Sequence, residues 1–311
     1  MPAKMPPRFT NADAARKHLE ALLWADGRNC PHCGVVNEST LLKGQSTRPG
    51  VYWCNACQKP FSVTVGTLYE RSKVPLNTWL YATHLLCSSK KGISSHQLAR
   101  MLGVTYKTAW FMAHRIREAM KPAEGSAPPL GGAGKIVEAD ETYVGKKDGK
   151  RKAPGAGGMA HKRTVLSLVE RGGKIRSFKI GSASRDEIGP AIRANVHPES
   201  TLHTDGSQVY RGLAMTDGHE SVDHNKTYVR DSNTGAKVHT NTLEGFFSVF
   251  KRGMVGTYQH CGEQHLDRYL AEFDFRANHR VKLGYDDATR ADVALQGIIG
   301  KRLTYRRTNA A

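Results

Sequence analysis

Two pairs of cysteines impose the strongest constraint on how this chain folds. Cys30 and Cys33 form a Cys-x2-Cys pair, and twenty residues later Cys54 and Cys57 form another. Each pair lies in a short turn, so four thiolates can surround one Zn²⁺, whose binding energy replaces the core that so small a module lacks. The pattern predicts one structural Zn²⁺ on all four cysteines. A redox pair or two incidental pairs would show the same spacing.

The remaining sequence features favour an intracellular protein. The N-terminus MPAKMPPRFT has no apolar segment typical of a secretory signal, and no run of about 18 apolar residues predicts a membrane span. In a reducing compartment paired cysteines bind metal more often than they form disulfides. Cys87 and Cys261 lack partners at a suitable spacing, and we interpret them as small buried residues. We expect a cytoplasmic, nucleoid-associated protein.

The chain carries a large positive charge. Its 46 Lys and Arg against 28 Asp and Glu give a formal net charge of +18, and the basic residues are spread along the chain. Such an excess binds polyanions because each phosphate contact releases condensed counterions. The composition therefore predicts a nucleic-acid partner, although a merely basic, well-solvated surface would have the same composition. No basic amphipathic helix with a strong apolar face suggests a membrane partner.

Residues 75–120 predict three helices, of which the last two resemble a helix-turn-helix. Gly103 permits the tight turn between them, and Thr105 caps the second helix. That helix would present three side chains to DNA: Tyr106, Lys107 and His114. Helical hairpins also occur without DNA, and that alternative remains open.

After a linker rich in Pro, Gly and Ala at residues 121–134, the pattern changes to strands. Three successive strand candidates, KIVEADETYVGKK, RTVLSLVER and GKIRSFKIG, precede a helix (DEIGPAIRANV) and the strand STLHTDG. Gly172 and Gly173 predict a hairpin turn between the second and third strands. A further strand is expected at KTYVR, followed by helices from about 240 to 279. The sequence predicts an α/β mixed sheet flanked by helices.

Two acidic residues lie near the ends of strand candidates. Asp140 lies near the end of an apolar central strand, and Asp205 ends STLHTDG before a glycine. Both positions let a carboxylate leave the core at the rim of a sheet. Glu141 points to the other strand face and is interpreted as structural, whereas His203 shares the face of Asp205 and is a candidate for supporting it.

The segment TNTLEGFFSVFKRG predicts an amphipathic helix with a third carboxylate. One face carries Asn241, Glu244, Ser248 and Lys251. The opposite face is apolar and would anchor the helix: Leu243, Phe246, Phe247, Phe250 and Met254. Two strand carboxylates and one helix carboxylate can hold a pair of divalent cations, although each alone also fits an ordinary solvated position.

With these motifs the chain resembles bacterial insertion-sequence transposases of the DDE type, in the group with an N-terminal zinc ribbon and an RNase H-like catalytic domain. The resemblance covers nearly the whole chain: the four cysteines, the helical segment, ADETYVGKK, HTDG and HTNTLEGFFSVFKRGMVGTYQH. In this family a basic residue follows the third acidic position by seven residues, which is Lys251 here. Relatives vary at that acidic position, and Asn241 is the alternative to Glu244.

The resemblance implies a transposase that binds insertion-sequence ends and catalyses phosphodiester hydrolysis and strand transfer. Two Mg²⁺ or Mn²⁺ ions per active site would be bridged by Asp140 and held also by Asp205 and Glu244. They would activate water to free a 3′-hydroxyl, which then attacks target DNA. Lys251 would contact a phosphate or pair with Glu244. The implied partners are double-stranded DNA at the transposon ends and target, and a homodimer or higher assembly on DNA.

Further basic residues are predicted to bind DNA. The basic excursion from 146 to 163 is expected to follow a DNA backbone, with Arg252 near Lys251. Arg276 and Arg280, with Lys282 nearby, are expected to extend that surface. The candidates within the excursion are Lys146, Lys147, Lys150, Arg151, Lys152, Lys162 and Arg163. Two alternatives stay open at this point. A nuclease or junction resolvase would share the carboxylates but not join DNA, and a zinc-ribbon regulator would bind DNA without needing them.

Five segments are expected from these patterns. They are an N-terminal helix and zinc ribbon (1–74), a helix-turn-helix-like segment (75–120), a linker (121–134), an RNase H-like catalytic domain (135–285) and a C-terminal tail (286–311). The predicted fold class is therefore α/β, with the zinc ribbon and helical segment preceding the mixed-sheet catalytic domain.

Overall fold

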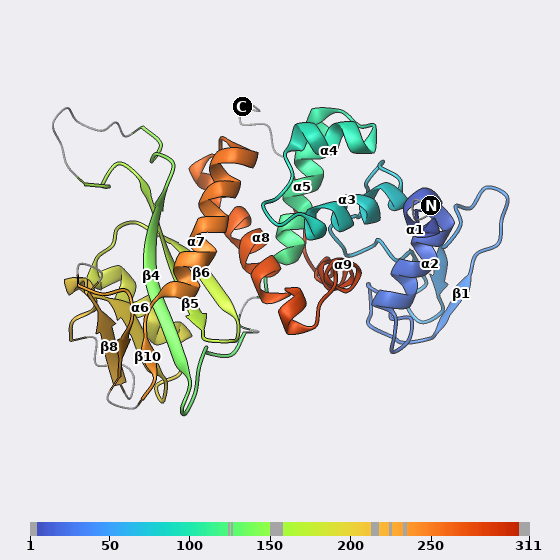
Figure 1. Ribbon diagram of the computed structural model, residues 1–311. Helices are drawn as coiled ribbons and strands as arrows, with labels where there is room; N and C mark the ends of the chain where they lie inside the picture. Colours follow the sequence, from blue (N-terminus) through green and yellow to red (C-terminus); the bar gives the residue numbers. More distant parts are fainter. Residues whose placement is uncertain are drawn as a thin grey trace. The chain divides into compact units, whose positions relative to one another are not determined.

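The computed structural model describes most of the chain and divides it into two compact units (Figure 1). The described residues are 5–123, 125, 127–149, 158–212, 218–223, 226–232 and 235–304. One unit comprises residues 1–89, 93–121 and 284–311, and the other comprises 90–92 and 122–283. None of the described helices is long and apolar enough to cross a membrane.

The first unit combines a small sheet with helices. Its helices are α1 (Pro7–Thr10), α2 (Ala12–Leu23), α3 (Leu76–Ser88), α4 (Ser95–Leu102), α5 (Tyr106–Met120) and α9 (Asp287–Gln296). Its strands are β1 (Ser39–Leu41), β2 (Tyr52–Cys54) and β3 (Pro60–Phe61), which pair antiparallel in that order. The four-cysteine module is therefore a three-stranded ribbon, as the cysteine spacing predicted.

The two helices of the predicted helix-turn-helix begin and end where the sequence indicated. The Ser94 hydroxyl accepts a hydrogen bond from the Gln97 amide and caps α4, which ends at Gly103 with φ of +64°. Only glycine adopts this left-handed conformation without steric cost, so the chain turns there. The Thr105 hydroxyl then accepts a hydrogen bond from the Thr108 amide and caps α5.

The C-terminal segment differs from the expected tail. Helix α9 buries Ala291, Ala294 and Leu295 and packs against α3 and α5. Beyond it, the Lys301 ammonium donates hydrogen bonds to three carbonyls at the end of α5, those of Glu118, Ala119 and Lys121. These are among the carbonyls that a helix end leaves unpaired, so the segment completes the first unit.

The second unit is a five-stranded mixed sheet between helices. Its strands are β4 (Ile136–Val144), β5 (Arg163–Glu170), β6 (Ile175–Ile180), β7 (Thr201–Asp205) and β8 (Gly218–Val222), with a separate pair β9 (Arg230–Asp231) and β10 (Lys237–Val238). The strand order is β6-β5-β4-β7-β8. Strands β4, β5 and β6 pair antiparallel, whereas β7 and β8 continue parallel to β4. This order and these directions are RNase H-like, as predicted.

Helices cover both faces of this sheet. They are α6 (Arg185–Asn195), α7 (Asn241–Gly253) and α8 (Leu266–Asn278), with short turns η1 (Gln208–Tyr210), η2 (Met254–Tyr258), η3 (Glu263–His265) and η4 (Val281–Leu283). On one face of β4, Val137 and Ala139 share a core with α6. On the other face, Val144 packs with Phe250 of α7 and Phe273 of α8. Successive strand residues point to opposite faces, so the even-numbered residues of β4 point toward α7.

Two segments depart from the sequence prediction. Part of the expected linker is fixed, because the Leu130 amide donates to the Asn195 carbonyl (2.7 Å) and Leu130 is 3% exposed. The expected strand KTYVR is wrong, since only Arg230 of that segment pairs, in the short strand β9. The edge strand beside β7 is β8 instead, whose sequence GHESV is mostly polar and lacks an apolar run.

The buried face of β5 gives a direct test of this packing. Val165 is fully buried in the core shared with α7 and α8, so Val165→Ala should lower the free energy of unfolding by about 2 kcal/mol. Val281, which is 73% exposed, provides the matched control, and Val281→Ala should stay within roughly 0.5 kcal/mol. Urea unfolding followed by circular dichroism measures both. Equal effects would contradict the assigned core.

Candidate active site and zinc site

The first two predicted catalytic carboxylates lie on adjacent parallel strands. Strands β4 and β7 pair with Glu138 opposite His203, and two residues further along each strand come Asp140 and Asp205. The Asp140 carboxylate accepts a hydrogen bond from the Glu141 amide (2.7 Å), and the Asp205 carboxylate accepts one from the Ser207 amide (3.0 Å). Both side chains are partly exposed. The sheet therefore brings two carboxylates together at one rim.

The third carboxylate lies on the solvent-exposed face of α7. Glu244 is exposed, as are Asn241, Ser248 and Lys251, the residues expected on its face. The opposite face is buried through Leu243, Phe247 and Phe250. The helical spacing in the sequence thus predicted correctly which side of α7 packs and which side carries Glu244.

The acidic side chains act on one another electrostatically. Burial first, and then the charges of Glu141, Asp205 and Glu244, raise the pKa of Asp140 to about 7. Burial disfavours the charged form and the nearby like charges add to that effect, so this carboxyl holds its proton above its ordinary range. Asp205 and Glu244 therefore both lie within electrostatic reach of Asp140. A cation among them would remove the repulsion.

The donor set fits divalent cations in its chemistry. Among the described residues, the ligand atoms of these carboxylates do not all lie within 4.8 Å of one another, a spacing found for the cysteine cluster alone. A single ion with three ligands would need a tighter set, whereas two ions about 3.5–4 Å apart allow wider separations. Carboxylate oxygens suit Mg²⁺ or Mn²⁺. The arrangement is thus compatible with a two-ion site.

Glu138, two residues before Asp140, is a site residue that the sequence reasoning missed. It is fully buried, and its carboxylate accepts hydrogen bonds from the amides of Thr242 (3.1 Å) and Leu243 (3.3 Å) and from the Thr242 hydroxyl (2.9 Å). An N-cap side chain normally accepts from these amides, but the N-cap residue Thr240 provides no such bond. Glu138 on β4 therefore caps α7, the helix that carries Glu244.

A guanidinium completes the surroundings of Glu138. Arg171 donates from Nε and Nη2 to the Glu138 carboxylate at 3.1 and 3.0 Å, and it also donates to the carbonyls of Lys237 and His239. His203, which was predicted to support Asp205, is fully buried and instead accepts a hydrogen bond from Arg171 through Nδ1 (3.3 Å). Burial and the neighbouring Arg171 lower the pKa of His203 to about 4, so the imidazole is neutral. It supports the Arg171–Glu138 contact.

Glu141 occupies the opposite face of β4, as predicted. Its carboxylate accepts a hydrogen bond from the hydroxyl of Tyr210, which is buried in the core beside α6. Burial raises the pKa of Glu141, and its charge contributes to the raised pKa of Asp140. Although its contacts are structural, Glu141 adds negative potential behind the predicted catalytic carboxylates.

The four paired cysteines form the predicted cluster in the first unit. The Sγ atoms of Cys30, Cys33, Cys54 and Cys57 all lie within 4.8 Å of one another. The Cys30–Cys57 and Cys33–Cys54 sulfur distances are 3.7 and 3.6 Å, close to the roughly 3.8 Å expected for thiolates around tetrahedral Zn²⁺. The Cys57 amide hydrogen-bonds to Cys54 and lowers the pKa of that thiol to about 7. The cluster supports a structural zinc site.

The cations expected to follow DNA have different environments. Lys146 is exposed, Lys147 donates from Nζ to the Gly181 carbonyl (2.6 Å), and Lys162 is partly exposed. Three expected cations lie outside the described residues: Lys150, Arg151 and Lys152. On α7, Lys251 and Arg252 are both exposed in the last helical turn.

Two arginines in the predicted DNA-binding surface are instead internal. Arg163 is 6% exposed and donates to the carbonyls of Lys146 (2.9 Å) and Cys261 (2.6 Å). Arg276 is 8% exposed and pairs with the fully buried Glu272. Both predictions were wrong, because burial commits each guanidinium to partners within the chain.

In the helix-turn-helix-like segment, two of the three predicted contact residues are at the surface. Tyr106 is 48% exposed and stacks on the His96 ring at 4.3 Å, and Lys107 is exposed. His114 is 1% exposed and packs on the Trp110 ring at 4.1 Å, so the expected contact of His114 with DNA is wrong. His114 lies eight residues after Tyr106, the first residue of α5, and its side chain faces the core of the first unit.

Comparisons with known proteins agree with this organisation. Residues 129–278 match the family of the ISXO2-like transposase domain, and residues 10–60 match the transposase zinc-ribbon domain. A protein of the transposable element ISH50 from Halobacterium salinarum, itself uncharacterized, is 29% identical over 284 residues, which is 86% of this chain and 91% of the relative. Together the two matched domains cover more than half of the chain. The chain belongs to the insertion-sequence transposases of the DDE type with an N-terminal zinc ribbon.

Two solved structures of the Mos1 transposase are also similar to parts of this chain. The first is a paired-end complex with the left transposon end, 12% identical, covering 70% of this chain and 74% of that chain with a TM-score of 0.27. The second is a pre-cleavage transpososome, 13% identical, covering 66% and 70% with a TM-score of 0.25.

The cysteine cluster predicts a defined zinc content. Metal analysis of the purified chain should give about one zinc per chain, and Cys54→Ser should reduce it and destabilise the ribbon, because binding energy contributes to folding. Cys261→Ser is the matched control, since Cys261 is buried outside the cluster and should leave the zinc content unchanged. Undiminished zinc in Cys54→Ser would contradict the site.

The cap on α7 predicts a large effect from one buried carboxylate. Glu138→Ala should lower the free energy of unfolding by about 3 kcal/mol, because it removes the acceptor of two helix amides and the carboxylate that pairs with Arg171. Glu138→Gln keeps one acceptor oxygen and should lose less. Glu199→Ala, at an exposed position, is the control and should change stability by less than roughly 0.5 kcal/mol. Thermal unfolding of the three variants decides between a cap and an incidental contact.

Proposed function

We propose that this chain binds the ends of an insertion sequence and catalyses metal-dependent phosphodiester hydrolysis and strand transfer into target DNA. The observation that carries the proposal is the placement of Asp140 and Asp205 at matching positions on the adjacent parallel strands β4 and β7, with the charges of Asp205 and Glu244 adding to burial in raising the pKa of Asp140. The occurrence of a relative in a transposable element supports the same activity. The net charge of +18 supports a DNA substrate.

Asp140, Asp205 and Glu244 would hold two Mg²⁺ or Mn²⁺ ions. The charges of both Asp205 and Glu244 act on Asp140, so Asp140 is the carboxylate we assign to both ions. When bound, such ions supply activation of the attacking oxygen and stabilisation of the leaving oxygen. Without them, the raised pKa of Asp140 shows that the site resists carrying its full negative charge.

Other side chains of the chain would position DNA. Lys251 lies seven residues after Glu244 on the same exposed face of α7, where its ammonium would bind a phosphate beside the carboxylates. Arg252 lies next to it, and its guanidinium donates to Ser248 (2.7 Å), which holds it along the helix. Lys146, Lys147 and, in the first unit, Lys107 would add sequence-independent phosphate contacts. A homodimer or higher assembly on DNA would bring two ends together.

The test combines DNA cleavage and joining in one reaction. Wild type, Asp205→Asn and Asp231→Asn are incubated with Mg²⁺, a labelled fragment carrying the element's own end, and a supercoiled target. Asp231 lies in an exposed ion pair with Lys237, so its variant is a matched control that should retain activity. Asp205→Asn should reduce nicking and joining by a factor of about 100 or more, because it removes a metal ligand.

The products separate the alternatives. Joined products from wild type and Asp231→Asn, but not Asp205→Asn, would support a transposase with Asp205 in its metal site. Nicked DNA without joining would favour a nuclease. Binding of DNA with neither product, and with no response to Mg²⁺, would favour a DNA-binding regulator and overturn the proposed catalysis.

A further inference from the structure

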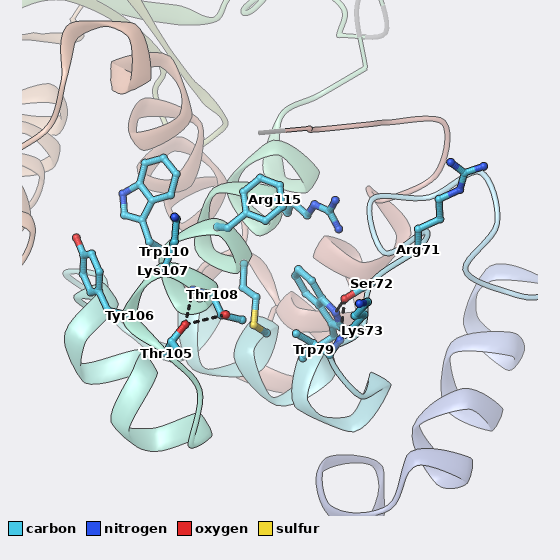
Figure 2. A pocket seen from close by; sticks show the side chains of 13 residues that line it. Arg71, Ser72, Lys73, Trp79, Thr105, Tyr106, Lys107, Thr108, Trp110 and Arg115 are labelled. Carbon is cyan, nitrogen blue, oxygen red and sulfur yellow. Dashed lines mark hydrogen bonds between the residues drawn. The ribbon is translucent and has the colours of Figure 1, made fainter. Parts of the chain in front are cut away.

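A pocket of about 600 Å³ lies in the first unit, apart from the carboxylates and the cysteines (Figure 2). The first half of α5 forms one wall, and the segment 71–79, which leads into α3, forms another. This volume is within the range of sites that bind small organic ligands. Neither the zinc site nor the proposed active site uses it.

Aromatic side chains form much of the wall. Tyr106, Trp110 and Phe111 come from α5, and Trp79 comes from α3. The Trp79 indole donates to the Ser72 hydroxyl (2.8 Å), which fixes the ring against the segment before α3. Figure 2 shows Tyr106 and Trp110 on one side of the pocket and Trp79 on the other. Trp79 is 2% exposed, whereas Tyr106 is 48% exposed and Trp110 and Phe111 are partly exposed. A flat, aromatic ligand would therefore stack on the accessible rings of α5, with Trp79 behind the opposite wall.

Cations complete the lining. Arg71, Lys73, Lys107 and Arg115 all contribute, and the lining includes no acidic residue. The Arg115 guanidinium lies 4.6 Å from the Phe111 ring centroid, a cation–π contact that joins the charged and aromatic parts. Glu70, outside the lining, lies 3.7 Å from Arg71 in an exposed pair that offsets little of the charge. The pocket therefore favours a ligand that is both aromatic and anionic.

We propose that this pocket binds an unpaired nucleobase of DNA, with the adjoining phosphate contacting Lys107 and Lys73. The proposal rests on the proposed function, since it takes DNA as the substrate. A paired base offers only its edges in the grooves, so aromatic walls of this kind contact a base face only where the base is unstacked. Stacking on aromatic side chains combined with phosphate-binding cations is how proteins bind single strands. The pocket thus recognises a frayed or single-stranded nucleotide of the substrate.

The test compares DNA molecules that differ by one base. Fluorescence anisotropy measures the Kd for a fully paired duplex, for the same duplex with a one-nucleotide 3′ overhang, and for that overhang with an abasic site. Wild type should bind the overhang about tenfold or more tightly than its abasic counterpart. Trp110→Ala should abolish this preference, and Trp110→Phe should retain most of it.

Controls separate the pocket from folding and from general DNA binding. Trp53→Ala is the matched variant, because Trp53 is 38% exposed on β2 and does not line the pocket, and it should keep the preference. Thermal unfolding and zinc content verify that each variant is folded. On the unmodified protein, photocrosslinking of an overhang that carries 5-iododeoxyuridine should label peptides containing residues 105–111 or 71–79.

The outcomes distinguish this proposal from the proposed function. The pocket assignment would be overturned if wild type bound the overhang and its abasic counterpart with equal affinity, or if crosslinks formed only outside these peptides. If the protein still bound duplex DNA, the transposase proposal would stand. Loss of binding to every DNA would overturn both. Tight binding of free dTMP by wild type, without a base preference in the overhang, would assign the pocket to a mononucleotide and also overturn the proposal.

Discussion

The buried carboxylate of Glu138 is the contact on which the geometry of the candidate active site depends. A carboxylate without solvent is costly unless donors surround it, and here Arg171 and the first turn of α7 provide them. Because Glu138 and Asp140 lie on the same face of β4, the bond that caps α7 also sets where Glu244 stands relative to Asp140. The dipole of α7 also attracts the Glu138 carboxylate, because the N-terminus of the helix is its positive end.

Repulsion between like groups characterises both candidate metal sites. Four thiols meet in the ribbon, and burial raises the pKa of Cys57 to about 12. At the rim of the sheet, burial and then the neighbouring carboxylates raise the pKa of Asp140 to about 7. In each case a cation relieves a cost that the folded chain imposes by bringing the groups together. Thiolates suit Zn²⁺ and carboxylates suit Mg²⁺ or Mn²⁺, so the two sites would differ in the ion that they select.

Local patterns were a good guide wherever one stretch of chain carried the whole signal. The spacing of the cysteines, the turn at Gly103 and the apolar stripe of α7 each follow from periodicity or turn chemistry within a few residues. The prediction failed where partners distant in the sequence determine the outcome. Strand β8 has a polar sequence and is a strand because β7 pairs with it. Arg163 is internal, and the Cys261 carbonyl accepts a hydrogen bond from its guanidinium.

The sequence by itself therefore determined the class of protein, the zinc ligands, the order of elements from β4 to β7, and the three acidic residues proposed to bind metal. The tertiary structure decided which cations remain at the surface, how residues 286–304 complete the first unit, and that Glu138 caps α7. The physical reason is the range of the interactions. Helix periods and metal-ligand spacings are local, whereas burial of Glu138 joins residues more than 100 positions apart and depends on the finished sheet.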